Sequence, residues 1–474
     1  MDFLYYDIVF LVLFFVGTAL FLYKNRKNLV IESKIVFLYK TKMGLSTIDR
    51  IGKKYPKFLN FLSDIVIVFG YLMMAVSIFF LVYLIKIMFD SSVVPKIAPI
   101  VPLIPYMPAL FKLDFLPPFY FTYWIIVIAI IAVGHEFAHG IFARLNSVRL
   151  KSTGFGFIGP LLAAFVEVDE EQMATKPIKA QLSVLAAGSF ANLIMALVFL
   201  AAMNGFFLGA YHPQGVVFNM YAINAVNVSE IYGLNGMPVN GLYSDYQTLR
   251  SNNVTQFEFI VNNKSYFGDA EIVDTQLINE NVSQLILYDN SPAYRANLSG
   301  IIQTISSSDR EYKINVIDDI ANSLSELKPG QQITVGTTTG NYTLTLGSDS
   351  ANSSKSYLGI AYVKLKERFV GKVISFFMVK DPFTYYEPRL GGMFGDLTIF
   401  IYNLFYWIVL VNFSVMMVNM LPFAIFDGGR FFYLSVLALT TQKKALRTFK
   451  IMNWIMILIL ALMMVVWFIR AYGF

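Results

Sequence analysis

The chain has 474 residues, of which 56% are hydrophobic and only 14% are charged. Soluble domains carry roughly 45–50% apolar and about 25% charged residues, so this composition excludes a disordered chain and argues against an ordinary soluble enzyme. Cysteine is absent, which excludes disulfide scaffolds, thiol catalysis, cysteine zinc sites and iron–sulfur clusters. Basic loops at a membrane surface explain the net charge of +6, so we expect lipids as partners and no nucleic acid.

Six uncharged runs are long enough to cross a bilayer as helices, each of which needs about 20 residues. The sequence therefore predicts a polytopic α-helical membrane protein. The first helix is expected to begin near Phe3. It is preceded by Asp2 and lacks a basic n-region and a cleavage site, so we interpret it as an uncleaved anchor. The predicted spans lie near 8–23, 65–85, 115–134, 180–206, 397–426 and 451–469.

The distribution of Lys and Arg predicts the orientation of the spans. Residues 24–63 carry ten basic residues against two acidic ones, which is typical of a cytoplasmic loop. The loop 89–114 has only two basic residues and is expected outside. Later basic clusters at 144–179 and 443–450 are expected inside again. This pattern places the N-terminus and residues 207–390 on the extracytoplasmic side.

The segment 207–390 differs in composition, because it is rich in Asn, Ser, Thr and Gly. Alternating apolar and polar residues, as in QITVGTTTGNYTLTL at 332–346, predict half-buried strands and an inserted β-rich soluble domain. Residues 231–249 and 302–324 echo each other as a strand, a turn and a short helix. The stretch SPAYRANLSGII at 291–302 and the strands that follow Lys328 resemble a PDZ domain, so we expect one or two PDZ-like modules.

The third span runs directly into the sequence HEFAH at 135–139. His135 and His139 are four residues apart, so on a helix they share one face and can hold one Zn²⁺ ion, with Glu136 beside them as a general base. The alternative is polar packing between helices, but ionisable residues inside a membrane helix are costly and by default mark function. If Arg144 marks the inner interface, His135 lies roughly 14 Å into the membrane, nearer the cytoplasmic face.

A catalytic zinc ion needs a third protein ligand. The chain has three histidines, and the remaining one, His212, is expected on the wrong side of the membrane, so we interpret it as a surface residue. Pro422 should break the last part of the 397–426 run, and Gly428 and Gly429 permit an irregular turn. Asp427 would then present a carboxylate to the histidines and leave a fourth position for water. The alternative is an ordinary helix end with an Asp–Gly turn.

These motifs together resemble the site-2 protease family of intramembrane zinc metalloproteases. The resemblance rests on HEFAH at 135–139, on GSFAN at 188–192, and on Asn419, Pro422 and Asp427-Gly428 in a later span. An extracytoplasmic PDZ-like insert between them also fits the family. One conservative departure is Phe426, where the family often has leucine.

The resemblance implies a role for each residue. His135, His139 and Asp427 would bind one Zn²⁺ ion, with Glu136 as general base and then acid. Asn192 would donate a hydrogen bond near the substrate carbonyl or oxyanion; the alternative is an interhelical hydrogen bond. Asn419 would orient either the substrate backbone or its own loop.

The apolar stretch 153–168 is expected to form a strand or hairpin that dips into the membrane, with an interfacial loop as the alternative. Because a helical substrate must unwind before hydrolysis, pairing with an exposed strand edge would hold it extended. We expect this edge at the three glycines of the stretch, Gly154, Gly156 and Gly159.

The resemblance also divides the chain into four parts. Residues 1–90 would form an N-terminal two-helix membrane module with a basic cytoplasmic loop, which the family core does not predict. Residues 115–206 and 391–474 would form the two halves of a protease core, separated by the PDZ-like region 207–390. The implied activity is cleavage of transmembrane proteins or peptides near the cytoplasmic face, in regulated intramembrane proteolysis or in clearance of membrane peptides.

Other classes of function remain open. One alternative is a non-catalytic membrane receptor or chaperone with a protease-like core, although an intact Glu136 argues against it. Another is a metal transporter, for which repeated broken helices are missing. An aspartyl protease would need a partner for Asp427, and Asp7 lies at the opposite end of the first span. Iron or cobalt also fits a ligand set of two histidines and one aspartate. The sequence indicates neither the substrate nor the oligomeric state.

Overall fold

The computed structural model describes residues 3–32, 36–89, 104–110, 113, 116–158, 161–277, 282–349, 352–362 and 380–472. Most of the predicted loop 89–114 and Gly159 therefore lie outside the described residues. The chain divides into two compact units. The membrane unit comprises Met1–Phe206 and Ile399–Phe474, and the insert unit comprises Phe207–Thr398.

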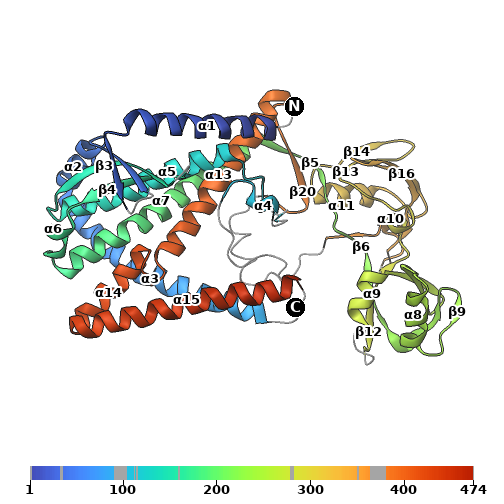
Figure 1. Cartoon of the computed structure of the whole chain (residues 1–474). Helices are drawn as coiled ribbons and strands as arrows, with labels where there is room; N and C mark the ends of the chain where they lie inside the picture. The colour runs from blue at the N-terminus through green and yellow to red at the C-terminus, as the bar shows by residue number, and fades with distance from the viewer. Residues whose placement is uncertain are drawn as a thin grey trace. The chain divides into compact units, whose positions relative to one another are not determined.

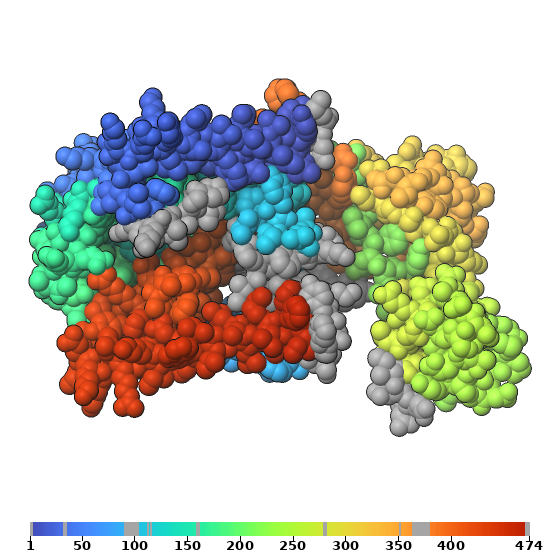
Figure 2. Space-filling model, viewed as in Figure 1, coloured from blue at the N-terminus to red at the C-terminus, as the bar shows by residue number. Residues whose placement is uncertain are grey.

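Within the described residues, six helices are long and apolar enough to cross a membrane, which confirms the predicted polytopic class. In Figure 1 the long helices of the membrane unit run in broadly the same direction. The outer two, α1 and α15, lie at the upper and lower edges of this unit in Figure 2 and leave most of their apolar side chains exposed, as lipid-facing helices do. The six helices are α1 (Phe3–Asn25), α3 (Pro56–Phe89), α5 (Phe121–Leu145), α7 (Ile178–Ala210), α13 (Gly392–Asn419) and α15 (Gln442–Tyr472).

A four-stranded antiparallel sheet joins the N-terminal segment to the rest of the membrane unit. Its order is β1 (Leu29–Glu32), β2 (Val36–Thr41), β3 (Leu150–Ile158) and β4 (Leu161–Val168). The predicted hairpin at 153–168 is thus present as β3 and β4. The expected edge at Gly154 and Gly156 is wrong, because β2 pairs with residues 153–158 of β3. The free edge of the hairpin is therefore β4.

The glycine at position 154 has a packing role instead. A Cβ atom there would overlap the carbonyl oxygen of Tyr39 on the neighbouring strand and the ring of Phe165. Only glycine therefore allows β2 and the Phe165 ring to approach β3 this closely.

The amphipathic helix α2 (Leu45–Lys54) packs on α5 just after the sheet. Ile48 is fully buried, and Gly52 lies so close to Arg144 and the Ile141 carbonyl that a side chain would not fit. Asp49 forms an ion pair with Arg144. The N-terminal segment therefore packs tightly against the helix that carries the histidines.

The break in the apolar run 397–426 occurs where Pro422 predicts it. Helix α13 ends at Asn419, residues 420–426 are irregular, and α14 (Asp427–Leu439) begins directly at Asp427. The expectation of an irregular turn at Gly428 and Gly429 is wrong, because both lie in the first turn of α14. They are needed for close backbone contact, since a Cβ on either would overlap main-chain atoms of 420–423.

Two hydrophobic cores organise the insert unit, one in each of two lobes. The first lobe (223–289) is built on a sheet of order β7-β12-β11-β10-β8-β9, and the second lobe on a sheet of order β16-β15-β13-β5-β20 with β14 beside β13. The echo is confirmed: β8, β9 and α8 in the first lobe correspond to β13, β14 and α11 in the second. The PDZ-like identity of the lobes stays a prediction.

The elements of the insert unit have the following bounds: β5 (Tyr211–Val216), β6 (Met220–Tyr221), β7 (Ile223–Asn227), η1 (Val228–Glu230), β8 (Ile231–Leu234), β9 (Met237–Pro238), α8 (Leu242–Ser251), β10 (Gln256–Val261), β11 (Lys264–Asp269), α9 (Ala270–Gln276), β12 (Gln284–Asp289), α10 (Pro292–Arg295), β13 (Ile302–Ser306), β14 (Glu311–Lys313), α11 (Ile317–Glu326), β15 (Gln332–Thr337), β16 (Gly340–Thr345), β17 (Gly347–Ser348), β18 (Ser356–Tyr357), β19 (Ile360–Ala361) and β20 (Thr384–Pro388). Two short helices complete the membrane unit, α4 (Met107–Leu110) and α6 (Glu170–Ala174).

Candidate metal centre

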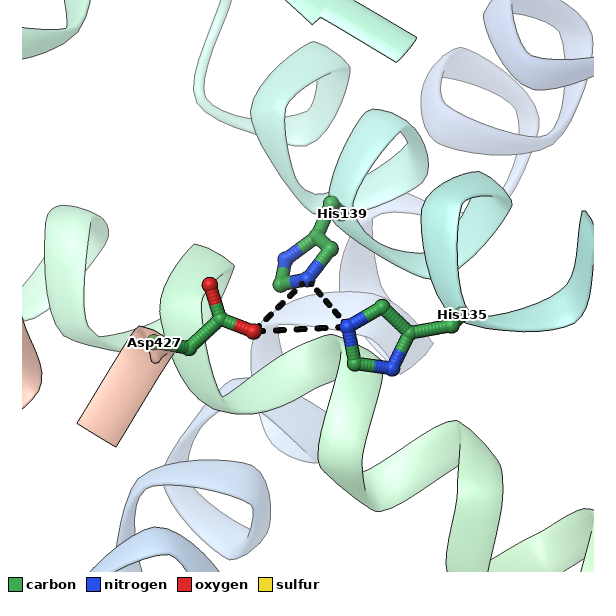
Figure 3. Close-up of side chains that lie close together, drawn as sticks. All are labelled: His135, His139 and Asp427. Carbon is green, nitrogen blue, oxygen red and sulfur yellow. Dashed lines mark hydrogen bonds and ion pairs between the residues drawn. The ribbon is translucent and has the colours of Figure 1, made fainter. Parts of the chain in front are cut away.

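Three side chains from two distant parts of the chain point toward one another in the membrane unit (Figure 3). Nε2 of His135 lies 3.0 Å from Nε2 of His139, and Oδ2 of Asp427 lies 3.3 Å from each of them. The helical spacing of four residues puts both imidazoles on one face of α5, and the start of α14 supplies the carboxylate. The predicted ligand set is therefore brought together.

The donor atoms fit a transition-metal ion of the zinc type. One nitrogen from each histidine and one carboxylate oxygen lie within 4.8 Å of one another. Two imidazoles and one carboxylate form a ligand set that proteins use for catalytic zinc, with a further position left for water. His135 is 7% exposed, so its imidazole is largely buried.

Helix α7 contacts both imidazole rings. Nδ1 of His139 donates a hydrogen bond to the Val184 carbonyl at 2.7 Å, which leaves Nε2 as the nitrogen with a free lone pair. A Cβ atom at Gly188 would overlap Nε2 of His139 and Cε1 of His135. The glycine of the GSFAN motif is thus required for the space that the two rings occupy.

Asn192 lies on the same helix, against the other ring. Its Nδ2 is 3.1 Å from Nδ1 of His135, and its Oδ1 is buried without a hydrogen-bond partner among the described residues. Rotating the amide by half a turn exchanges its nitrogen and oxygen, so Oδ1 would accept a hydrogen bond from Nδ1–H of His135. Nε2 of His135 would then be free to bind a cation, as the ligand set requires.

The second predicted amide lies on the open side of the site. Nδ2 of Asn419, the last residue of α13, is 3.3 Å from Nε2 of His135, the nitrogen that faces Asp427. Asn419 is thus closer to the metal-facing atoms than Asn192 is. The oxyanion role assigned to Asn192 stays a prediction.

Glu136 bridges the histidine helix and the edge strand of the sheet. Its Oε2 accepts a hydrogen bond from the backbone N–H of Val166 in β4 at 3.0 Å. Sequence reasoning did not include Val166, because no local pattern reports which strand edge will meet the helix. The contact holds one oxygen of the carboxylate at the rim of the metal site.

A cavity of about 810 Å³ gives access to this site. Its inner wall contains the three candidate ligands, Glu136 and Asn419. Its outer wall is charged, and an ion pair between Arg430 and Glu170 joins α14 to α6 across it at 3.6 Å. Water can therefore reach the candidate ligands through this cavity.

The third histidine is not part of this group. His212 lies in β5 of the insert unit and is half-buried, and it does not join the three-residue cluster found among the described residues. His212 thus lies outside the candidate metal site, as expected, but the interpretation of it as a surface residue is wrong, because it is half-buried and its Nδ1 is buried.

A comparison with known proteins finds a family match that includes the candidate metal centre. Residues 123–463 match the family model described as peptidase family M50. The match contains all three candidate ligands and leaves residues 1–122 uncovered. The chain is also 26% identical over 283 residues to an uncharacterized protein of Methanocaldococcus jannaschii, an alignment that covers 55% of this chain and 72% of that protein.

Proposed function

Because this chain belongs to peptidase family M50, the site-2 protease family of intramembrane metalloproteases, we propose that it hydrolyses peptide bonds in or near transmembrane segments of other membrane proteins. In this proposal His135, His139 and Asp427 hold one Zn²⁺ ion and Glu136 is the general base. The observation that carries the proposal is the meeting of three metal-type donor atoms, from α5 and α14, within 4.8 Å inside a membrane protein.

When bound, a zinc ion would activate a water molecule and polarise the scissile carbonyl. The chain's own residues prepare the site for this. Val184 fixes the tautomer of His139, and Asn192 orients His135. Because Oε2 of Glu136 accepts the Val166 N–H, we expect Oε1 to take the proton from the attacking water and to pass it to the leaving amide nitrogen.

The edge of β4 offers a way to present the substrate. A transmembrane helix hides its amide bonds in internal hydrogen bonds and must unwind before hydrolysis. Strand β4 pairs with β3 along one of its edges. At its other edge, the backbone N–H of Val166 donates a hydrogen bond to Glu136. An unwound segment added to this edge would lie extended beside the candidate metal ligands.

The site is proposed to lie toward the cytoplasmic side, on the basis of the basic loops. Substrates would be transmembrane proteins or peptides, and membrane lipids would contact the exposed apolar helices.

The test is proteolysis of a synthetic single-span substrate by the full chain in detergent or liposomes, with zinc quantified in the same samples. We expect cleavage that a chelator abolishes and zinc restores. Glu136→Gln should retain zinc but lose at least about 100-fold in kcat, because general-base catalysis contributes about 10²–10⁴-fold.

Two results would contradict the proposal. If wild type binds zinc but cleaves no substrate, and Glu136→Gln behaves identically, the receptor or chaperone alternative is favoured. If sealed vesicles show zinc flux that His139→Ala abolishes, without any proteolysis, the transporter alternative is favoured.

A further inference from the structure

A second pocket shares Glu136 with the metal cavity but is lined by none of the three candidate ligands. Its volume is about 130 Å³, and it lies between helix α5 and one face of the four-stranded sheet. Val133 and Phe137 line it from the helix. The sheet and the N-terminal segment supply the remaining walls: Thr41, Met43, Gly44, Thr153, Gly154, Phe155, Ala164, Phe165 and Val166.

Strand register defines which face of the sheet forms the floor. Thr41, Thr153 and Val166 are paired across β2, β3 and β4, so their side chains share one face. Phe155 and Ala164 are paired two positions further along, which puts them on this face as well. Ala163 alternates to the opposite face and is exposed.

The pocket adjoins the metal cavity. Glu136 and Val166 line both spaces, and they are joined by the hydrogen bond from the Val166 N–H to Oε2 of Glu136. The metal cavity has a charged outer wall, whereas the second pocket is lined almost entirely by apolar side chains and backbone. A peptide held at the metal site therefore passes a polar space on one side and an apolar space on the other.

We propose that this pocket is a specificity subsite, which receives the apolar side chain of the substrate residue next to the scissile bond. The proposal rests on the proposed protease function. Side chains of a strand added to β4 would alternate between the two faces of the sheet, so one residue would enter the pocket and its neighbour would face the polar cavity. A cavity of about 150 Å³ lined by apolar side chains accommodates benzene, so a volume of this order suits a leucine or phenylalanine side chain.

Part of this pocket is built by residues outside the family match. Thr41, Met43 and Gly44 precede residue 123, where the match begins. Gly44 has φ of +83°, a conformation that favours glycine, and a Cβ there would press on the Phe137 ring. The N-terminal segment therefore shapes a subsite beside the general base, and the side-chain preference of this chain depends on it.

The test compares Ala164→Leu with the control Ala163→Leu. Both add the same side chain to neighbouring positions of β4, but only Ala164 faces the pocket. Both are assayed on single-span substrates that differ only in the residue flanking the cleaved bond, which is Gly, Ala, Leu or Phe. Wild type should prefer Leu and Phe. Ala164→Leu should lower kcat/KM for Leu and Phe by about 10–200-fold relative to Ala, the range for hydrophobic pockets, and Ala163→Leu should leave the ratio unchanged.

Met43→Ala gives a second test that does not depend on fitting a larger side chain. Met43 is 67% exposed at the rim of the pocket, so truncation should not unfold the protein. It should raise the relative kcat/KM for a Trp substrate severalfold. If neither Ala164→Leu nor Met43→Ala changes the substrate preference, the subsite proposal is wrong. It is also wrong if kcat/KM falls equally for all substrates, which is the result expected when a lipid chain occupies the pocket. Absence of any chelator-sensitive cleavage by wild type overturns the proposed function itself and the subsite with it.

Discussion

Asp7 of the first transmembrane helix accepts two hydrogen bonds from Thr122 of α5, one from its backbone N–H at 2.8 Å and one from its hydroxyl at 2.6 Å. The same carboxylate accepts the backbone N–H of Phe121 and the hydroxyl of Tyr106. The residue before α5, Tyr120, provides no side-chain cap. Asp7 therefore caps the helix that carries the two histidines from another helix, satisfying two of the N–H groups that a helix start leaves unpaired.

Replacing Asp7 should destabilise the membrane unit without touching the metal ligands. Loss of a helix cap costs roughly 0.5–2 kcal/mol, and we expect Asp7→Ala to fall in the upper part of that range, since it leaves several donors unpaired. Asp7→Asn keeps one acceptor oxygen and should lose less. Thermal unfolding of the full chain in detergent measures the difference. Equal melting temperatures for wild type and Asp7→Ala would show that water replaces the cap.

Gly188→Ala should prevent metal binding. Its Cβ would overlap both imidazoles, so the rings would have to leave their positions. Gly205→Ala is the matched control on the same helix, because no heavy atom lies within 4 Å of its added Cβ. We expect Gly188→Ala to lose zinc by elemental analysis and to lose zinc-dependent thermal stabilisation, which reaches about 2.7 kcal/mol at 100 times Kd. Stoichiometric zinc in Gly188→Ala would mean that the ligands lie elsewhere.

Substitutions of Asn192 can distinguish whether its side chain positions His135 or donates to the substrate oxyanion. If it positions His135, Asn192→Ala should weaken zinc affinity by about 10–100-fold, and Asn192→Asp should restore it, because a carboxylate also accepts from Nδ1–H. If it donates to the substrate oxyanion, Asn192→Ala should lower kcat without changing zinc affinity, and the aspartate should not restore activity. Competition with a zinc indicator, run beside the protease assay, distinguishes these outcomes. The geometry favours the first.

The insert unit should respond to acid through Asp274. The Arg250 guanidinium, followed by the Tyr246 hydroxyl, holds the pKa of the Asp274 carboxyl below its ordinary value of 3.8. A carboxyl with a lowered pKa stabilises the folded state above its ordinary pKa, and this contribution is lost as pH falls through the folded pKa.

Arg250→Gln should therefore weaken hydrogen-exchange protection of α8 and α9 at neutral pH. The difference from wild type should shrink below about pH 4, where Asp274 in the variant and in the unfolded chain binds a proton. Arg310→Gln, which breaks the ion pair with Glu326 in the other lobe, is the control and should leave these helices unchanged. A difference that persists at low pH would point to a role of Arg250 other than its charge pair.

Much of the architecture could be predicted from the sequence, because the signals were local. Long apolar runs predicted the six spans, the spacing of four predicted the histidine pair, and Pro422 predicted the break before Asp427. The start of the first helix at Phe3 was also predicted. Each of these features is specified by residues within one or two helical turns.

The features that were missed depend on contacts between distant residues. Strand β2 pairs with β3 more than 110 residues later, so the basic loop gave no sign that it would cover that edge. Asp7 was considered only as a partner for Asp427, and its true partners follow it by about 100 residues or more. Glycines 428 and 429 suggested a turn, whereas their role is to let two backbone segments touch.

The sheet also determines how far the chain can be shortened. A protein trimmed to the family-matched region would lack β1 and β2, and both sides of the remaining hairpin would then offer unpaired N–H and C=O groups. Such a hairpin would be prone to join a neighbouring copy along β3. The minimal folding unit for expression is therefore longer than the shared domain, and it should begin before Leu29.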